Sequence, residues 1–397
     1  MDTHAVNTDV PALARLQQRA LVVGAIGLLA GGVGALQNPD QFFRSWLIGF
    51  LFCLGLSLGP LALLMLQHMS GGQWGLIGRR IFEAASRNLP YVALVFVPLL
   101  FGLPRLYMWA RPEVVQADHI LQMKAAYLNV PFFIARAVLY FAIWIGGAWL
   151  LNRWSAAQDR GELAVTPADS RRFRVVSAPG LVLYVLTITF ASTDWVMSLE
   201  PHWFSTIYGF IFVAAQGLTG FAFVILVLSW LTGTPPYATF LNPRHFLDLG
   251  KLLLAFVMLW AYFSFSQFLI IWAGNLPEEI PFFQTRLQGG WQYVSVAILL
   301  GHFVLPFALL LSRDLKRRPR LLATVATIVL IFRFADLVWL VEPSAGPGRF
   351  PLHWMDLAIP AGLVGIWLFL FARQLRSRPL LPMNDPFFKE AFAHDVH

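Results

Sequence analysis

The chain has 397 residues, of which 58% are hydrophobic and only 13% are charged, and its mean hydropathy is +0.64. An average soluble domain is about a quarter charged, so this composition excludes a soluble enzyme, a disordered regulator and a secreted disulfide scaffold. What remains is an all-α polytopic membrane protein. At about 20 apolar residues per crossing, the chain has room for about ten transmembrane helices and short loops, but not for a sizeable soluble domain.

Ten hydrophobic segments are predicted to cross the membrane. The first is treated as an anchoring span, because its apolar run is long for a signal peptide. A tail over 1–15 precedes the transmembrane domain over 16–375, and a second tail over 376–397 follows it. The predicted spans are 16–36, 42–68, 84–109, 131–152, 175–197, 204–231, 248–273, 289–312, 320–341 and 353–374.

The basic residues predict the orientation of these spans. Most of the 29 Lys and Arg residues lie in the N-terminal tail, in the loops after even-numbered spans and in the C-terminal tail. Because cytoplasmic loops carry an excess of Lys and Arg, both termini are predicted to be cytoplasmic. These loops also account for the net charge of +8, so we expect lipid around the chain and no nucleic acid as a partner.

The chain has a single cysteine, Cys53, which lies within an apolar run. One cysteine cannot form an intrachain disulfide, an iron–sulfur cluster or a thiolate zinc site, and there is no Cys-x-x-Cys-His motif for covalent haem. A b-type haem held by two span histidines is disfavoured, because His68 and His302 are expected at different depths. We therefore expect no metal and no cofactor bound by this chain.

Polar residues at membrane depth are costly and usually face the interior of a helix bundle, where they often mark a pathway. One such group is expected near the outer side of the membrane and is interpreted as a polar pocket or a proton path that opens outward. Its members are Arg136, Asp194, His202, Tyr262, Ser266, Gln267, Arg333 and Asp336, with Glu200, Glu278 and Glu279 in the loops beside them.

Pairings within this outer group can be predicted in part. Arg333 and Asp336 are three residues apart and share one helix face. They belong either to the path or to a structural ion pair that fixes helix packing. Asp194 has no basic neighbour in its own helix, so it is expected to bind Arg136 or Arg333 from another helix, or to stay protonated.

A second group is expected near the cytoplasmic side and consists of His68, Arg79, Arg80, Glu83, Asp248, Lys251 and His302. A tight turn over 70–75 is predicted to follow His68, with Glu83 about one turn into the next helix. For Lys251 an interpretation without a role in a proton path is also open, since the side chain of a lysine at a helix start can extend to the membrane interface. His302 is expected near mid-membrane, either as a hydrogen-bonded packing residue or as a proton carrier suited to neutral pH.

Three stretches of sequence carry a resemblance to a known family. They are FASTDWVMSLEPHW over 190–203, the pair FSFSQ and WAGNLPEE over 263–267 and 272–279, and a C-terminal run through Arg333, Asp336 and Trp339, HWMD over 353–356 and RPLLPMNDP over 378–386. Together they resemble the ActF-type subunit of bacterial alternative complex III, and the resemblance covers essentially the whole chain. That family belongs with the NrfD-like, or polysulfide-reductase-like, integral membrane subunits.

The resemblance implies two four-helix bundles, here over 42–197 and 204–341, flanked by the first and last spans. It implies a complex of the bacterial inner (cytoplasmic) membrane that oxidises a quinol, such as menaquinol, and passes electrons to cytochrome c or a terminal oxidase. It also implies a sister NrfD-like subunit, an iron–sulfur subunit and c-type cytochromes as partners. The iron–sulfur clusters and haem c would be held by those partners.

Three functions are left open by the sequence. In the first, the chain is a cofactor-free subunit of a quinol:cytochrome c oxidoreductase in the respiratory chain, not catalytic alone, and contributes a proton path, a quinone-binding site or both. Asp194 is then the candidate base for quinol oxidation. The second is a secondary transporter, which interrupted spans and buried charges would suit. The third is a structural membrane anchor for redox subunits, in which the buried pairs only fix packing.

Overall fold

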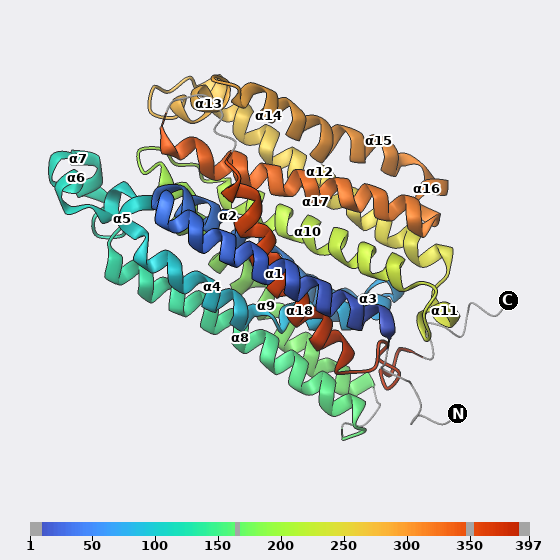
Figure 1. The fold of residues 1–397 in the computed structure, drawn as a ribbon. Helices are drawn as coiled ribbons and strands as arrows, with labels where there is room; N and C mark the ends of the chain where they lie inside the picture. Colours follow the sequence, from blue (N-terminus) through green and yellow to red (C-terminus); the bar gives the residue numbers. More distant parts are fainter. Residues whose placement is uncertain (1–9, 163–166, 347–352, 389–397) are drawn as a thin grey trace.

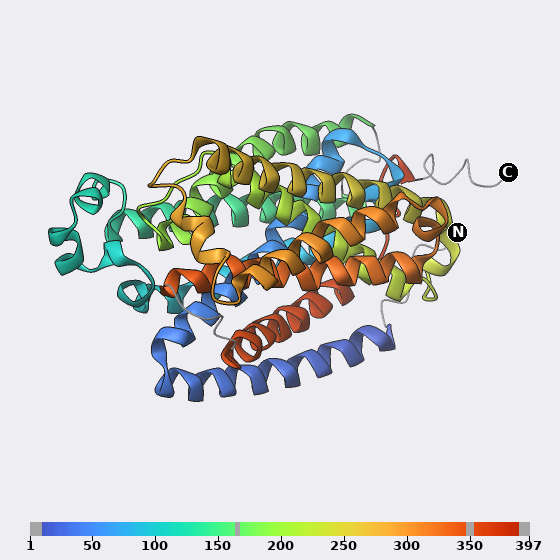
Figure 2. The same cartoon turned by 90° about the horizontal axis from the view of Figure 1, so that it is seen from above.

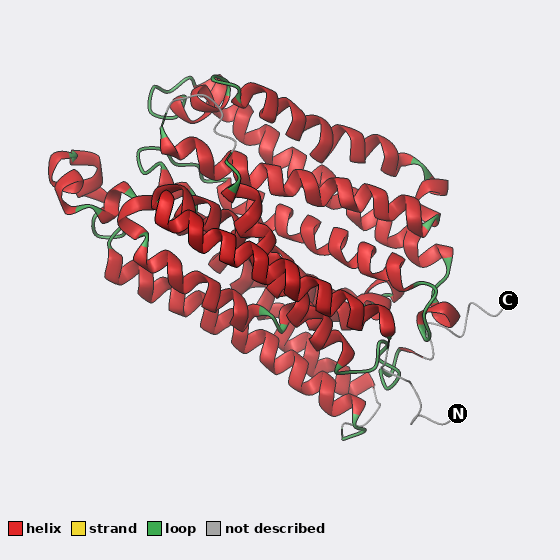
Figure 3. Ribbon diagram, in the orientation of Figure 1, coloured by secondary structure: helices red, strands yellow, loops and turns green. Residues whose placement is uncertain are grey.

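The computed structural model describes residues 10–162, 167–346 and 353–388. This described part is helical throughout and contains no β-strand (Figures 1 and 3). Ten of its helical segments are long and apolar enough to cross a membrane, which confirms the prediction of an all-α, multi-pass membrane protein. Of the predicted tails, residues 1–9 and 389–397 lie outside the described residues.

The helices follow one another along the chain with short connections. In order they are α1 (Pro11–Gln37), α2 (Pro39–Ser70), α3 (Gln73–Ser86), α4 (Leu89–Phe101), α5 (Leu103–Leu106), η1 (Met108–Ala110), α6 (Pro112–Ala117), α7 (His119–Lys124), α8 (Val130–Asp159), α9 (Pro167–Trp195), η2 (Met197–Leu199), α10 (Tyr208–Leu231), α11 (Tyr237–Phe240), α12 (Pro243–Gly274), α13 (Pro281–Arg286), α14 (Trp291–Ile298), the π-helical turn η3 (Leu299–Val304), α15 (Leu305–Leu311), α16 (Arg313–Arg317), α17 (Pro319–Val341), η4 (Glu342–Ala345) and α18 (Met355–Arg376).

The two ends of the molecule carry different short elements. Helix α1 begins and α18 ends at the same end of the molecule, which also carries α11 and α16 (Figure 1). We call this the inner end, because the sequence predicts it to be cytoplasmic. The opposite end, called the outer end, carries α13 and a lobe of short helices, α5–α7, that projects away from the spans (Figures 1 and 2).

Helices α2 and α10 form the centre of the molecule. Their most apolar windows are 94% and 89% buried, far more than those of the other spans. The two helices cross at Gly59 and Gly220, where a Cβ added to Gly59 would lie 2.2 Å from the carbonyl oxygen of Gln216. Such a close approach of two backbones requires glycine at the crossing. The two halves of the chain are therefore joined at a contact between small residues.

Two groups of helices lie on either side of this central contact. The first helix group contains α2, α3, α4, α8 and α9, and the second contains α10, α12, α14, α15 and α17. Apart from the first residues of α2, they fall within 42–197 and 204–341, the ranges that the resemblance assigns to separate bundles. Helices α1 and α18 pack against each other, and α18 also packs against α2, so this pair covers one side of the centre (Figure 2).

The third span differs from its predicted bounds of 84–109. It covers Gln73–Phe101 and consists of α3 and α4, because the helix resumes directly after the two-glycine turn at 71–72. The hydropathy pattern missed α3, since its charged side chains are buried against protein and do not face lipid. The predicted turn over 70–75 was therefore too long, and Glu83 lies near the end of α3 and not near the start of a helix.

Candidate functional site

The first helix group holds a buried ion pair between Arg136 on α8 and Asp194 near the end of α9. The guanidinium donates through Nε and a terminal nitrogen to the two carboxyl oxygens of Asp194, each at 2.8 Å. Asp194 is fully buried and Arg136 is 7% exposed. Of the alternatives predicted for Asp194, the structure shows the pairing with Arg136.

Further donors complete the surroundings of this pair. Tyr140 donates to Asp194 at 2.8 Å, and Arg136 donates to the carbonyl of Tyr127 at 2.9 Å. Tyr107 donates to a main-chain carbonyl at the end of α9 at 2.9 Å, and burial raises the pKa of Tyr107, so this phenol stays a neutral donor. A carboxylate with three hydrogen-bond donors and no exposed surface is poorly placed to take a proton from a quinol.

The second helix group holds its ion pair on a single helix. Arg333 donates to Asp336 one turn further along α17, and each residue is 4% exposed. This confirms the ion pair predicted from their spacing. The guanidinium of Arg333 also lies 5.6 Å from the centre of the Phe212 ring on α10, so the pair faces the central helices.

His302 lies beside this second pair, in the π-helical turn η3. A Cβ added to Gly301 would lie 2.1 Å from the Phe332 ring, which places η3 against α17 next to Arg333. The imidazole is fully buried, and its ring centre lies 4.2 Å from that of Trp260. Neither ring nitrogen of His302 nor the indole nitrogen of Trp260 has a hydrogen-bond partner among the described residues.

From its position in the span, His302 is predicted to belong with the inner residues. The structure places it in the second helix group, where η3 packs against α17. π-Helical turns are rare in proteins, but those that occur often lie at functional sites. Buried polar atoms without a protein partner are also rare in native folds and call for an explanation by function or by ordered water.

The other residues of the predicted outer group lie apart from the two ion pairs. Tyr262 is 64% exposed on the outward surface of α12, and Ser266 is half-buried one turn further along. Gln267 is buried, and its Oε1 has no partner within the described part of the chain. His202 is bound to Asp118 at 2.6 Å in the loops of the outer end. The structure therefore does not gather all the predicted outer residues into one pocket.

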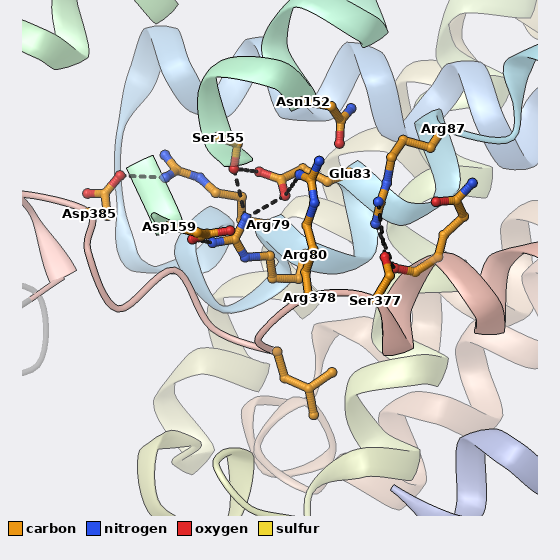
Figure 4. A network of polar contacts seen from close by, with 12 residues as sticks. Arg79, Arg80, Glu83, Arg87, Asn152, Ser155, Asp159, Ser377, Arg378 and Asp385 are labelled. Carbon is orange, nitrogen blue, oxygen red and sulfur yellow. Dashed lines mark hydrogen bonds and ion pairs between the residues drawn. The ribbon is translucent and has the colours of Figure 1, made fainter. Parts of the chain in front are cut away.

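At the inner end, α3 and α8 meet in a network of charged side chains, shown in Figure 4. Arg80 binds Glu83 at 2.7 Å and also binds Asp159 at the end of α8. Ser155 accepts from Arg80 at 2.7 Å and donates to Glu83 at 2.6 Å. Arg378 approaches Glu83 at 3.6 Å, and burial lowers the pKa of Arg378.

A C-terminal segment over 377–388 folds back over this network. Its Asp385 binds Arg79 of α3, and both residues are buried. Its Asn384 donates at 3.2 and 3.0 Å to the last carbonyls of α8, those of Gln158 and Asp159. The described part of the predicted tail is therefore an element of the folded inner end (Figure 4).

His68 joins this inner network, whereas Asp248 and Lys251 do not. His68 lies 3.5 Å from Arg79 and stacks on Phe173, with ring centres 4.7 Å apart. Lys251 binds Asp248 at 2.8 Å on the exposed start of α12, where both side chains line a shallow surface pocket of about 390 Å³. Their exposure agrees with the interpretation of Lys251 as an interfacial side chain that has no role in a proton path.

The sequence interpretation missed a motif that is repeated at the outer ends of α9 and α17. Both helices end in Asp-x-Val-x-x-x-Glu-Pro, over 194–201 and 336–343. The Asp of each copy belongs to one of the two buried ion pairs described above. A helix-by-helix comparison of the two halves of the sequence reveals this repeated motif.

The Glu of each motif binds an arginine of the other helix group. Glu200, after α9, binds Arg286 of α13 at 2.6 Å, and Glu342, after α17, binds Arg44 of α2 at 3.2 Å. These two ion pairs tie the helix groups together at the outer end. The partners are 86 and 298 residues apart in sequence, so spacing alone could not reveal them.

No family model and no curated protein sequence matches this chain. Within residues 10–162, 167–346 and 353–388, no three or more His, Cys, Asp or Glu side chains are grouped so as to hold a metal ion. The basis for assigning a function is therefore the geometry of the buried polar residues together with the family-like motifs in the sequence.

Proposed function

We propose that the chain is a cofactor-free membrane subunit of a bacterial quinol:cytochrome c oxidoreductase, or of a related quinol:acceptor complex, in the cytoplasmic membrane. The resemblance of its three motif stretches to ActF-type subunits supports this assignment, and the ten spans agree with it. Both termini are assigned to the cytoplasm from the distribution of Lys and Arg. Within the complex, the chain contributes a path for protons.

The observation that carries the proton path is the environment of His302. Its imidazole is fully buried, leaves both ring nitrogens without a partner among the described residues, and lies beside the Arg333–Asp336 pair. An ionisable group at membrane depth is costly and is usually kept for a function. An imidazole can take up a proton at one ring nitrogen and release one from the other, so we assign His302 the role of a proton carrier beside the Arg333–Asp336 pair.

The inner network has a different role in this proposal. Glu83 is held by Arg80, Ser155 and Arg378, and Asp385 is held by Arg79. These contacts join α3, α8 and the C-terminal segment within the first helix group. They support a structural role for the network, and the proton path is assigned to the second helix group.

Quinol oxidation is assigned to a partner subunit and not to this chain. Asp194, the candidate base, is fully buried and already accepts from Arg136 and Tyr140. The resemblance supplies the partners: a sister NrfD-like subunit, an iron–sulfur subunit and c-type cytochromes that hold the redox groups. Cytochrome c or a terminal oxidase is the electron acceptor.

A His302→Leu variant of the intact complex in sealed vesicles tests the proton path. Quinol-driven proton movement is expected to fall by at least about 100-fold, the lower range for loss of a positioned proton-transfer group, while the subunits still assemble. Tyr293→Phe is the control, because Tyr293 is 75% exposed on the same span and should leave proton movement unchanged. Equal proton movement in both variants would favour the structural-anchor function.

The transporter alternative makes a separate prediction. Vesicles that contain the chain alone would then take up a solute without any quinol or redox partner. No solute uptake is expected under the proposed function, because proton movement depends on quinol oxidation in the partner subunits.

A further inference from the structure

The outer end contains a pair of buried acids that the proposed proton path does not use. Glu342 begins η4 directly after α17, and Asp356 lies in the first turn of α18. Glu342 is 1% exposed and Asp356 is 3% exposed. Gln41 and Ser45 of α2 contact them and are equally buried. The site therefore joins the centre of the molecule, the second helix group and α18.

The two acids share one hydrogen-bond network. The amide nitrogen of Gln41 donates to Glu342 at 3.1 Å and to Asp356 at 2.7 Å. Both carboxyl groups therefore lie within hydrogen-bond distance of the same nitrogen atom. Ser45 contacts the same Asp356 oxygen at 2.5 Å, and the main-chain N–H of His353 donates to the other oxygen at 3.3 Å.

One arginine binds this network directly, through Glu342 and Gln41. Arg44 of α2 donates to Glu342 at 3.2 Å and, through another nitrogen, to the Gln41 side-chain oxygen at 2.7 Å. Asp356 forms no ion pair with any described residue, and its contacts are the neutral donors of Gln41, Ser45 and the main chain.

The remaining charged and titratable groups near the site are engaged elsewhere. Asp40 of α2 is bound to Arg105 of α5, and both side chains are about half exposed. The ring nitrogen Nδ1 of His353 accepts from the main-chain N–H of Met355, so it serves the start of α18. Among the residues that the structure describes, the site thus carries two carboxyl groups and one guanidinium.

This charge balance is unlike that of the other buried acids in the described residues, each of which binds an arginine directly. The pairs are Glu83 with Arg80, Asp194 with Arg136, Asp336 with Arg333 and Asp385 with Arg79. Glu83 shares Arg80 with Asp159 but also has Arg378 at 3.6 Å. Glu200, at the same motif position as Glu342, has Arg286 to itself. Two carboxylates that share a buried site cannot both ionise without a large cost, so one of them keeps a proton.

We propose that Glu342 and Asp356 form a proton-binding site in which the two carboxyl groups hold one proton at neutral pH. The proton balances the surplus charge and turns one of the acids into a hydrogen-bond donor. The site lies at the outer end, where a proton can be stored or released on the side opposite the predicted cytoplasmic face. This inference goes beyond the proposed function, because it rests on charge balance within the chain and needs no partner subunit.

Infrared spectroscopy of the purified full-length chain tests the site. Exposed carboxyl groups titrate near pH 4, so an absorption band of a protonated carboxyl at neutral pH reports a buried acid. The wild-type chain is expected to show this band at the intensity of one group. Glu342→Gln and Asp356→Asn should each abolish it, because each variant leaves one carboxyl group at the site and no second carboxylate forces that group to keep a proton. Glu200→Gln is the matched control and should keep the band.

Thermal unfolding gives a second test that does not depend on the band. The folded wild-type chain binds one proton more than the unfolded chain, so its Tm should fall as the pH rises through the titration of the site. This pH dependence should vanish in Glu342→Gln. Glu342→Gln should also unfold at a higher temperature than Glu200→Gln, because Glu200→Gln leaves the buried Arg286 without a counter-ion.

Several results would overturn the proposal. A wild-type chain without the band, or a band that persists in both Glu342→Gln and Asp356→Asn, would show that the pair holds no proton. A Glu342→Gln chain that is less stable than Glu200→Gln, or that fails to fold, would show that Glu342 is needed as a simple ion-pair partner. A Tm that rises with added sodium or calcium in the wild type only would show that a cation balances the charge.

Discussion

Arg136 on α8 and Asp194 on α9 bind each other through two parallel hydrogen bonds of 2.8 Å at a site from which solvent is excluded. The pair connects two neighbouring helices of the first helix group. Removing one partner of a buried pair leaves the other charge uncompensated, which usually costs about 3–5 kcal/mol. The geometry therefore gives Asp194 a role in helix packing.

Asp194→Asn is expected to lower the free energy of unfolding by about 3–5 kcal/mol, because Arg136 keeps its charge without a counter-ion. Asp248→Asn is the control, since Asp248 and Lys251 form an exposed pair whose loss should cost no more than about 1 kcal/mol. Thermal unfolding of both variants in the same detergent measures the difference. Equal unfolding temperatures would return Asp194 to the candidates for proton transfer.

Gly59→Ala is expected to destabilise the crossing of α2 and α10 by about 1–3 kcal/mol, the usual cost of overpacking. The new Cβ would lie 2.2 Å from the carbonyl oxygen of Gln216, which cannot move without bending α10. Gly146→Ala on α8 is the control, because no atom lies within 4 Å of its added Cβ. Unfolding temperatures measure both, and a Gly59→Ala chain as stable as Gly146→Ala would contradict the close crossing.

Asp385→Asn is expected to release the C-terminal segment from the inner end. The substitution removes the counter-ion of Arg79, which is 5% exposed. The segment over 377–388 then loses the ion pair that holds it against α3. Tryptic cleavage after Arg376, at the bond to Ser377 where the segment leaves α18, should become faster, on the order of 100-fold. Asp314→Asn, at an exposed position on α16, should leave the cleavage rate unchanged. A slow rate in both variants would show that other contacts hold the segment.

The outer lobe is expected to open at acidic pH. The hydrogen bond from His202 holds the pKa of Asp118 below its usual range. A depressed carboxyl pKa gives stability that is present above the ordinary value of about 4 and is lost as the pH falls through the lower folded-state value. The contact between α7 and the loop after α9 should therefore weaken below about pH 4.

Spin labels measure this opening directly. Cys53 is buried, so cysteines introduced at Glu113 and Phe204 can be labelled selectively. The distance between the labels should be narrow at neutral pH and broad in acid. Asp118→Asn, which keeps the helix cap but loses the charge, should give a broad distance at every pH. A distance unaffected by pH in the wild-type chain would contradict the role of the Asp118–His202 contact.

The spans could be predicted from the sequence because lipid-facing helices are long apolar runs. The same reasoning failed at α3, whose Arg79, Arg80 and Glu83 face protein, where hydropathy carries no information about burial. The ion pair of Arg333 with Asp336 was also predictable, since both residues lie on one helix face. For Asp194 the sequence could narrow the partner to Arg136 or Arg333, and only the packing of α8 against α9 decides between them.

The acid pair at the outer end could not be predicted in the same way. Gln41 lies 301 residues from Glu342 and 315 residues from Asp356 in the chain. Both acids stand at helix ends, where a charged residue is ordinary and where hydropathy gives no reason to expect burial. The folding of α18 against α2 brings them together, and the surplus carboxyl becomes visible only when the contacts of Arg44 are known.

The proposed role in a quinol-oxidising complex can be tested on the protein in its native membrane. The tagged chain is purified in mild detergent, and the product is identified by mass spectrometry and visible spectroscopy. We expect c-type cytochromes, an iron–sulfur subunit and a sister NrfD-like subunit to be recovered with the chain, together with quinol:cytochrome c activity. A haem-free particle without these partners and without this activity would contradict it.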